Sequence, residues 1–346
     1  MQILLLYDYR PQDPFFPASG LQVLGWYTAN WLRKLGHTII EDNLFNSIID
    51  PRRTIKPDLI LWIGYWGDAK YVPQTDEVKK VGYIVTDGVI PPKYRAVLNS
   101  MDGIIALSKK CQQILLRDGI KKVYQSYPGI DLNIFKPQEM NKRFFYIFSL
   151  WLHANMEGDK ALLEAIPKII KEYPNTRLIF KVQYAQTKEH YSWAKPFIMN
   201  NNLSEYVYFL SEMEPYKNMA RYYQRADIYA SVGGTIGFEF PFIEAGACSL
   251  PVVGLNAGTT PELIQDGYNG LLCNEYTQKK KIDIKSGISV EETYLIPSSD
   301  EIAEKVKTLI QAKDVYKTCS MGGIEMAKKF NIEDRIKDLS KILERI

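Results

Sequence analysis

The sequence predicts an α/β protein built from two doubly wound, Rossmann-like domains in tandem that face an interdomain cleft. Short apolar runs bounded by Gly, Pro and Asp alternate with helix-like segments along nearly the whole chain, as parallel sheets covered on both faces require. The chain of 346 residues exceeds the usual size of one domain. The alternation restarts after a polar segment at residues 137–142, which is a plausible linker. In such sheets, ligands bind at the carboxyl ends of the strands.

In the first half, two helices separate a series of short buried strands. Apolar residues at helical spacing predict a helix over residues 20–35, and Gly36-His37 ends it. Ser108 is a good N-cap for a second helix, 109–117, which Gly119 closes. The strands expected here are residues 2–7, 38–40, 58–63, 82–85 and 103–107.

The second half repeats this pattern. Helices are expected over residues 159–173 and 217–225. Residues 276–293 are charged and break the alternation, so we expect an inserted loop or a poorly ordered one. The strands expected here are residues 144–150, 177–182, 206–210, 227–231, 250–254 and 270–273.

Composition narrows the class of protein. A hydrophobic content of 46% with 24% charged residues is typical of a soluble globular chain, and no apolar run approaches the ~20 residues that span a bilayer. The net charge of +3 is too small to indicate nucleic-acid binding. The four cysteines are far apart, so neither a zinc site nor a disulfide framework is expected. Residues 1–9 lack the features of a signal peptide, and we expect a cytoplasmic protein.

One long stretch of the second half carries a specific set of motifs, at residues 225–273. The matching positions are Ala226-Asp227, Pro241, Glu244-Ala245, Pro251-Val252-Val253, Pro261-Glu262 and Asp266-Gly267-Tyr268-Asn269-Gly270. In this order and spacing they resemble the donor-binding region of family 4 retaining glycosyltransferases of the GT-B fold (glycosyltransferase group 1). Three features of the first half also fit the family: the segment YPGIDLNIFKP at residues 127–137, Gly36-His37 and Ser19-Gly20. The resemblance covers roughly residues 1–270.

The resemblance implies a GT-B fold with an N-terminal Rossmann-like acceptor domain over residues 1–138 and a C-terminal Rossmann-like donor domain over residues 143–325. A C-terminal helix, 326–346, could return to the first domain. The implied reaction moves a hexosyl unit from a UDP- or GDP-sugar to a glycan, lipid or protein acceptor, with retention at the anomeric carbon. We expect no metal and no cofactor, because the leaving phosphate can itself take the acceptor proton while the protein positions the reactants.

The donor site is expected around one helix start. Gly237 and Phe238 open a helix whose positive end favours the diphosphate of a nucleotide sugar. Glu244, one or two turns further in, can accept two hydrogen bonds from a ribose cis-diol. Taken alone, Glu244 could instead be a solvated helix acid. The donor-binding residues expected from the resemblance are Gly20, Lys181, Gly237, Phe238, Glu239, Phe240 and Glu244.

The sequence departs from the family pattern at the acids and cations of the donor site. Ile236 stands where the family has a second acid, and the nearest acid is Glu239, which could turn toward the sugar hydroxyls or face solvent. Glu157 takes the place of a lysine, and the family's arginine is missing, which removes charge that would stabilise the departing phosphate. Nearby substitutes are His153, Lys160 and Lys181.

A third departure lies in the first half. Some family members carry His-Asp after a strand near the acceptor, and the matching pair here is Thr86-Asp87. Threonine cannot act as a base, so the catalytic candidates are Asp87, Glu239 and His153. The alternative is a catalytically altered GT-B module that binds a nucleotide or glycan without turnover.

The first half is also the more basic one. Residues 1–137 hold 17 Lys and Arg against 13 Asp and Glu. Lys109, Lys110, Arg117, Lys121 and Lys122 cluster around the expected helix 109–117, which also carries the adjacent apolar residues 114–116. This helix could rest on anionic headgroups as a peripheral membrane contact, or it could be an ordinary sheet-covering helix with a solvated basic face.

Overall fold

The computed structural model divides the chain into two units. The first unit comprises residues 1–131, 282–292 and 330–346, and the second comprises residues 132–281 and 293–329. The structure describes residues 1–13, 16–17, 19–46, 56–73, 75–86, 88–151, 156–182, 187–233, 237–285 and 288–346. The division falls at residues 131–132, earlier than the linker expected from the sequence, because residues 132–142 contact the second unit.

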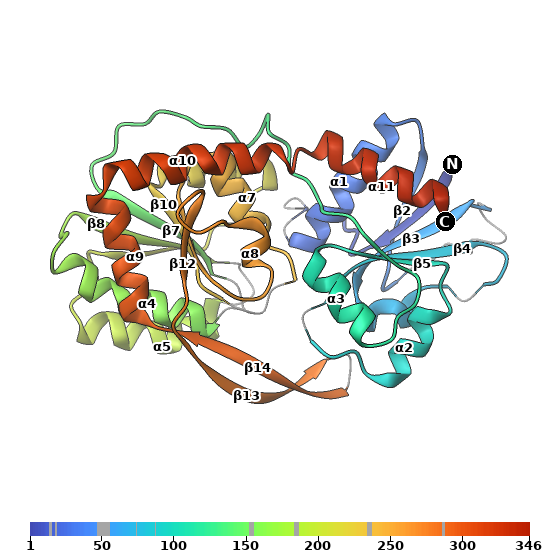
Figure 1. Cartoon of the computed structure of the whole chain (residues 1–346), viewed down its shortest axis with the longest axis horizontal. Helices are drawn as coiled ribbons and strands as arrows, with labels where there is room; N and C mark the ends of the chain where they lie inside the picture. Colours follow the sequence, from blue (N-terminus) through green and yellow to red (C-terminus); the bar gives the residue numbers. More distant parts are fainter. Residues whose placement is uncertain are drawn as a thin grey trace. The chain divides into compact units, whose positions relative to one another are not determined.

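The first unit is built on a six-stranded parallel sheet (Figure 1). The strand order is β2-β1-β3-β4-β5-β6, so the order reverses between β1 and β3. Residues 3–6 of β1 are fully buried, as the continuous apolar run predicts for a strand covered on both faces. The strands are β1 (Gln2–Tyr7), β2 (Thr38–Asn43), β3 (Leu59–Tyr65), β4 (Lys79–Val85), β5 (Gly103–Ala106) and β6 (Val123–Gln125).

Helices close both faces of this sheet. They are α1 (Gly20–Lys34), the 3-10 helix η2 (Trp66–Tyr71), α2 (Pro92–Asn99), α3 (Lys109–Arg117) and α11 (Ile332–Arg345). Helix α11 packs against α1, and the hydroxyl of Ser340 lies 2.8 Å from Nε2 of His37. At its start, a Cβ on Gly129 would lie 2.6 Å from the Cα of Ile332, so glycine permits this close approach of two backbones. The C-terminal helix is therefore part of the first unit.

The second unit contains another six-stranded parallel sheet, of order β12-β11-β10-β7-β8-β9. Here the order reverses between β7 and β10, which pair directly through Ile147 and Ile228. The strands are β7 (Phe145–Trp151), β8 (Thr176–Val182), β9 (Val207–Leu210), β10 (Ile228–Ser231), β11 (Val252–Leu255) and β12 (Gly270–Cys273).

The helices of the second unit are α4 (Met156–Ile170), α5 (Thr187–Asn200), the 3-10 helix η5 (Tyr216–Asn218), α6 (Ala220–Arg225), α7 (Phe240–Ala247), α8 (Thr260–Leu263), α9 (Ser299–Gln311) and α10 (Lys313–Lys328). Of these, α4, α5, α9 and α10 share one apolar core with the strands of the sheet. Helices α7 and α10 meet at glycines, since a Cβ on Gly246 would lie 2.9 Å from the carbonyl oxygen of Gly323. Because α10 runs to Lys328, the domain end expected at residue 325 falls inside a helix.

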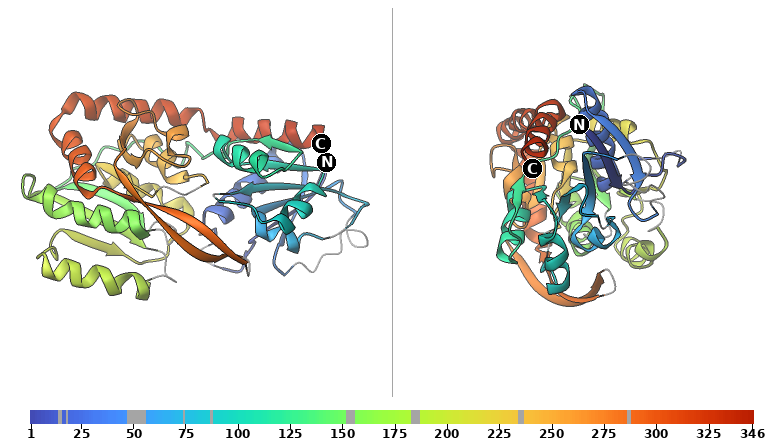
Figure 2. Two further views of the ribbon diagram at one scale, coloured as in Figure 1. Left: turned by 60° about the horizontal axis from the view of Figure 1, so that its bottom comes forward. Right: turned by 90° about the vertical axis from the view of Figure 1, so that its right-hand side faces the viewer.

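One prediction from the sequence is wrong. Residues 276–293 are not an irregular loop: β13 (Tyr276–Lys285) and β14 (Ile288–Pro297) pair as a two-stranded sheet. Figure 2 shows this pair in orange as a long, twisted ribbon. The sequence mixes charged and β-branched residues here, and β-branched residues favour strands, whereas the prediction considered only continuous apolar runs as strands.

Candidate active site in the second unit

The site forms where the strand order of the second sheet reverses. Helix α4 follows β7 and helix α7 follows β10, so both helices begin at the carboxyl ends of the two strands that flank the reversal. A Cβ on Gly158 would lie 2.9 Å from the backbone nitrogen of Gly233, so the start of α4 packs directly on the chain that leaves β10. Such a point in an open α/β sheet is where ligands bind.

Residues 237–239 precede α7, which begins at Phe240 and not at Gly237 and Phe238 as the sequence predicted. Gly237, Phe238 and Glu239 are buried, and the rings of Phe238 and Phe240 lie 5.3 Å apart. Glu239 is the N-cap residue, yet its side chain makes no capping hydrogen bond. Pro241 in the first turn favours the start of the helix at this position, because its missing N–H would have no intrahelical partner there.

Glu244 lies in the second turn of α7 and is only 2% exposed. Its two oxygens each accept a hydrogen bond from a tyrosine: Oε2 from the hydroxyl of Tyr223 at 2.6 Å, and Oε1 from the hydroxyl of Tyr216. Burial raises the pKa of Glu244 to about 7, although the two tyrosine hydrogen bonds oppose the rise. The structure therefore excludes the alternative of a solvated helix acid.

Packed aromatic rings hold this carboxylate in place. Tyr223 is fully buried, and its ring lies 5.2 Å from that of Phe148 and 5.7 Å from that of Tyr229. The ring of Tyr229 in turn lies 5.9 Å from that of Phe242 on α7. Packing of these rings therefore fixes the position of Tyr223, which donates to Glu244.

Glu239 and Asp159 form a pair of buried acids at the two helix starts. They are 2% and 4% exposed, and within the described part of the chain neither Oε2 of Glu239 nor Oδ2 of Asp159 has a hydrogen-bond partner. Burial raises the pKa of Glu239 to about 8, although a hydrogen bond with Ser231 lowers it. Burial and then the charge of Glu239 raise the pKa of Asp159 well above its usual value. Glu239 therefore does not face solvent.

Asp159, Tyr216 and Tyr223 are site residues that sequence reasoning missed. An aspartate in the first turn of a helix is usually an exposed, dipole-compensating residue, so nothing marked Asp159 as buried. The two tyrosines are seven residues apart near one helix, which places them on the same side of that segment. That spacing was the signal available for this pair.

The cations near the site are engaged elsewhere. Lys181, at the carboxyl end of β8, is 8% exposed and donates to the backbone oxygen of Glu212. Burial lowers the pKa of Lys181. Lys160 lies 3.7 Å from the carboxylate of Glu157, one turn earlier on α4. The roles expected for Lys181 and Lys160 at the phosphates therefore stay predictions.

The remaining residues expected from the sequence fall into two groups. Asp87, His153 and Ile236 lie outside the described residues. Gly20 begins α1 in the first unit, and Thr86 at the end of β4 is fully buried. Among the described residues, no group of three His, Cys, Asp or Glu side chains is placed to hold a metal ion. None of the helices in the described ranges is both long and apolar enough to cross a bilayer.

Comparison with known proteins finds relatives of this chain, and the family match lies mainly in the second unit. Residues 141–283 match the family model for glycosyl transferases of group 1. The chain is 23% identical over 255 residues to an uncharacterized glycosyltransferase of Methanocaldococcus jannaschii, covering 73% of this chain and 62% of that protein. It is 25% identical over 176 residues to spore coat protein SA of Bacillus subtilis, covering 45% of this chain and 46% of that protein. The chain thus spans less than two thirds of these relatives' lengths.

Solved structures show the same fold. Sucrose-phosphate synthase of Thermosynechococcus elongatus superposes with a TM-score of 0.78 at 14% identity, covering 99% of this chain and 98% of that chain. HepE of Anabaena, in complex with UDP and glucose, superposes with a TM-score of 0.75 at 15% identity over 100% of both chains. The resemblance to group 1 glycosyltransferases is thus confirmed for residues 141–283, and the two parallel sheets with their flanking helices are those of the GT-B fold.

Proposed function

We propose that this protein is a retaining glycosyltransferase of family 4 that moves a hexosyl unit from a nucleoside-diphosphate sugar to an acceptor. The observation that carries the proposal is the position of Glu244: a buried acid on α7, at the strand-order reversal, inside the segment that matches group 1 glycosyltransferases. HepE has been crystallised in complex with UDP and with UDP-glucose, which supports a UDP-sugar as the first donor to test.

In the proposed complex, the donor lies across the starts of α4 and α7. The diphosphate is favoured at the positive end of α7, next to residues 237–240. The ribose diol is bound by the carboxylate of Glu244. Two buried acids, Glu239 and Asp159, lie at the same helix starts. A negatively charged diphosphate therefore binds best while both acids are protonated.

The proposed chemistry assigns the proton transfer to the substrate. The leaving phosphate takes the acceptor proton while the protein positions the two substrates and stabilises charge. Because the pKa of Glu239 is about 8, its carboxyl is mostly protonated at neutral pH and can donate a hydrogen bond to the sugar or the phosphate. Asp87 and His153 are the further catalytic candidates. The proposal includes no metal ion.

A second candidate function is binding of a nucleotide or glycan without turnover. The observation that favours it is the absence of a cation committed to phosphate: among the described residues near the site, Lys160 lies beside Glu157, and Lys181 donates to a backbone oxygen. Without such a cation, charge that develops on the leaving phosphate is stabilised less.

The experiment that separates the two functions measures release of UDP and GDP from UDP-glucose and GDP-mannose, with and without candidate acceptors. Glycans, lipids and proteins from the cytoplasmic side of the membrane are the acceptor classes to include. Acceptor-dependent release, with retained configuration in the product, supports the enzyme. Binding of the nucleotide without release under any condition supports the second function.

A further inference from the structure

The two tyrosines that hold Glu244 differ in how firmly each is fixed. Tyr223 belongs to α6 and is fully buried, with the rings of Phe148, Tyr229 and Phe135 at centroid distances of 5.2, 5.7 and 6.0 Å. Any rotation of this ring would require a void in a close-packed aromatic cluster. The hydrogen bond from Tyr223 to Oε2 of Glu244 is therefore a permanent part of the fold.

Tyr216 sits in a different setting. It begins η5, a single turn of 3-10 helix that follows residues 211–215, which have no regular secondary structure. Its side chain is half-buried, and its ring lies 5.5 Å from that of Phe135. A half-buried tyrosine on an irregular segment can exchange rotamers without opening the core.

Hydrogen bonds and an ion pair hold the segment around Tyr216 on both sides of this residue. Lys181 donates to the backbone oxygen of Glu212. The carboxylate of Glu214 accepts a hydrogen bond from Nδ2 of Asn218 at 3.0 Å and pairs with Arg221. Because these contacts fix the backbone, Tyr216 can move its side chain while the loop remains in place.

Each oxygen of Glu244 already accepts a hydrogen bond from a tyrosine, and the residue is only 2% exposed, so an incoming diol reaches neither oxygen from solvent while both tyrosines stay in place. We propose that Tyr216 is an exchangeable hydroxyl: it occupies Oε1 of Glu244 in the unliganded protein and leaves when the ribose of a nucleoside diphosphate binds. This inference rests on the proposed function, since it takes the ribose to be bound by Glu244. Tyr223 stays in place and positions the carboxylate in both states.

Exchange has a measurable consequence for affinity. The ribose hydroxyl replaces a hydrogen bond that already exists, so part of its binding free energy is offset by the loss of the Tyr216 contact. Tyr216→Phe keeps the ring and removes the competing hydroxyl. We therefore expect Tyr216→Phe to bind the nucleotide more tightly, by about tenfold, the factor that corresponds to roughly 1.4 kcal/mol.

The test is isothermal titration calorimetry with UDP and GDP, followed by the 2′,3′-dideoxy form of the nucleotide that binds more tightly. The titrations are run at a pH of about 7.5, between the pKa of Glu244, about 7, and that of Glu239, about 8, so that Glu244 is mainly ionised while Glu239 is mainly protonated. The gain in Tyr216→Phe is expected for the natural nucleotide only, because the dideoxy form has no hydroxyls to exchange. Tyr223→Phe is the matched control and is expected to weaken binding of the natural nucleotide.

Two results would overturn the exchange: a Tyr216→Phe variant that binds the natural nucleotide more weakly, or one in which both nucleotides change by the same factor. Tyr216→Leu, which also removes the hydroxyl, replaces Tyr216→Phe if that variant does not fold.

Glu244→Ala separates this inference from the proposed function. If Glu244→Ala binds like the wild type, or if the wild type binds neither nucleotide, both are wrong. If Glu244→Ala loses affinity but Tyr216→Phe gains none, only the exchange is wrong.

Discussion

The two sheets of this protein reverse their strand order in the same way, but the helix starts beside the reversals differ. At the β1/β3 reversal, Ser19 caps α1 in a reciprocal capping box with Gln22, and Gln22 also donates to Asp8 at 2.8 Å. At the β7/β10 reversal, Glu239 precedes α7 without any capping bond, and its Oε2 is buried with no partner among the described residues. The first helix start is capped by a side chain, whereas at the second a buried carboxyl oxygen has no partner among the described residues.

The largest expected effect is a change of stability with pH, caused by the buried acid Glu239. Burial raises the pKa of Glu239 from 4.5 to about 8 in the folded protein, so the folded state holds the proton more tightly than the unfolded chain. The contribution of this group to stability is therefore complete below pH 4.5 and is lost as the pH rises to about 8. The free energy of unfolding should fall by roughly 1 kcal/mol for each pH unit in that window.

Urea unfolding at several pH values measures this slope. Glu239→Gln should reduce the slope, leaving the part due to Glu244 and Asp159, and should be more stable than the wild type on the alkaline side, because glutamine remains neutral. Glu325→Gln, at an exposed ion pair on α10, is the control and should leave the slope unchanged. A wild-type stability that stays constant from acid to alkaline pH would contradict the burial of this acid.

The second prediction concerns ligand binding at the reversal of the second sheet. Glu244→Ala should weaken binding of the nucleoside diphosphate by roughly 1–3 kcal/mol, the usual scale for losing a hydrogen bond to a charged group. Glu244→Gln should have a smaller effect, since one acceptor oxygen remains. Calorimetric titration with UDP and GDP checks both variants. Wild-type affinity in both would remove Glu244 from the site.

The third prediction compares a glycine on α7 with a glycine on α1. A Cβ on Gly246 of α7 would lie 2.9 Å from the carbonyl oxygen of Gly323, whereas a Cβ on Gly20 of α1 would have no atom within 4 Å. Gly246→Ala should therefore destabilise the protein by roughly 1–3 kcal/mol, because α7 must move away from α10. Gly20→Ala should be neutral or slightly stabilising. Equal thermal midpoints for the two variants would show that α7 and α10 adjust without cost.

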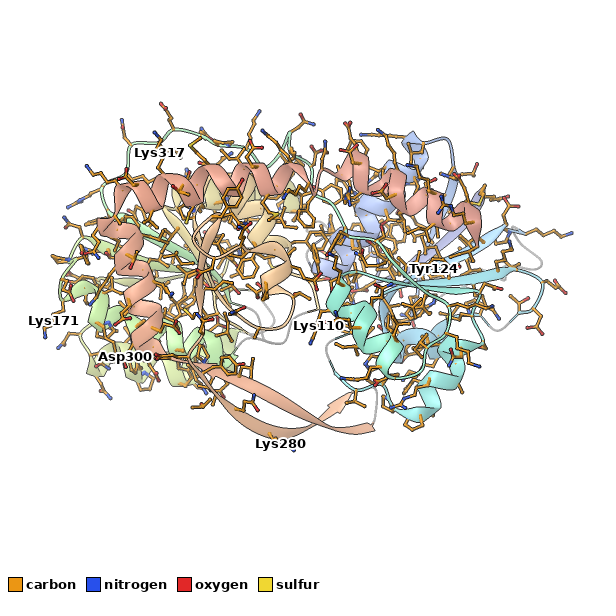
Figure 3. The ribbon with its side chains drawn as sticks, viewed as in Figure 1. Lys110, Tyr124, Lys171, Lys280, Asp300 and Lys317 are labelled. Atoms are coloured by element: carbon orange, nitrogen blue, oxygen red, sulfur yellow. The ribbon has the colours of Figure 1, made fainter. Side chains whose placement is uncertain are left out.

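The smallest expected effect lies outside both reversals, at α3 in the first unit. Ile114 and Leu115 are buried, Leu116 is 52% exposed, and Lys110 is on the exposed side of the helix (Figure 3). Membrane contact at α3 therefore depends mainly on its basic side chains, each of which contributes about 1 kcal/mol of binding free energy near an anionic surface. We expect a weak excess of protein on anionic over neutral vesicles at low salt.

Charge reversal at four lysines, 109, 110, 121 and 122, should remove that excess in a co-sedimentation assay. Reversal of Lys171 and Lys317, which are on the second unit (Figure 3), is the matched control and should leave the excess unchanged. Equal recovery on the two kinds of vesicle would favour an acceptor that is not in a membrane.

Buried strands were the most predictable part of the fold. The expected strands at residues 2–7 and 270–273 coincide with β1 and β12, because a continuous apolar run between turn residues has few alternatives. Elements on the surface were predicted less well. Helices α2, α5, α8, α9 and α10 were not predicted, and β13 and β14 were taken for a loop, because charged and polar residues interrupt the apolar pattern of these segments.

The sequence by itself determined the arrangement as two α/β domains, the group 1 glycosyltransferase motifs and the position of Glu244 on a helix after a buried strand. Only the tertiary structure decided that Glu244 is held by Tyr216 and Tyr223, and that Glu239 and Asp159 are buried together. The physical reason is that strand and helix patterns depend on neighbouring residues along the chain. Burial and pKa depend on segments that packing brings together, and here the contacts join the start of α4, the helices η5 and α6, and α7, which belong to separate elements of the chain.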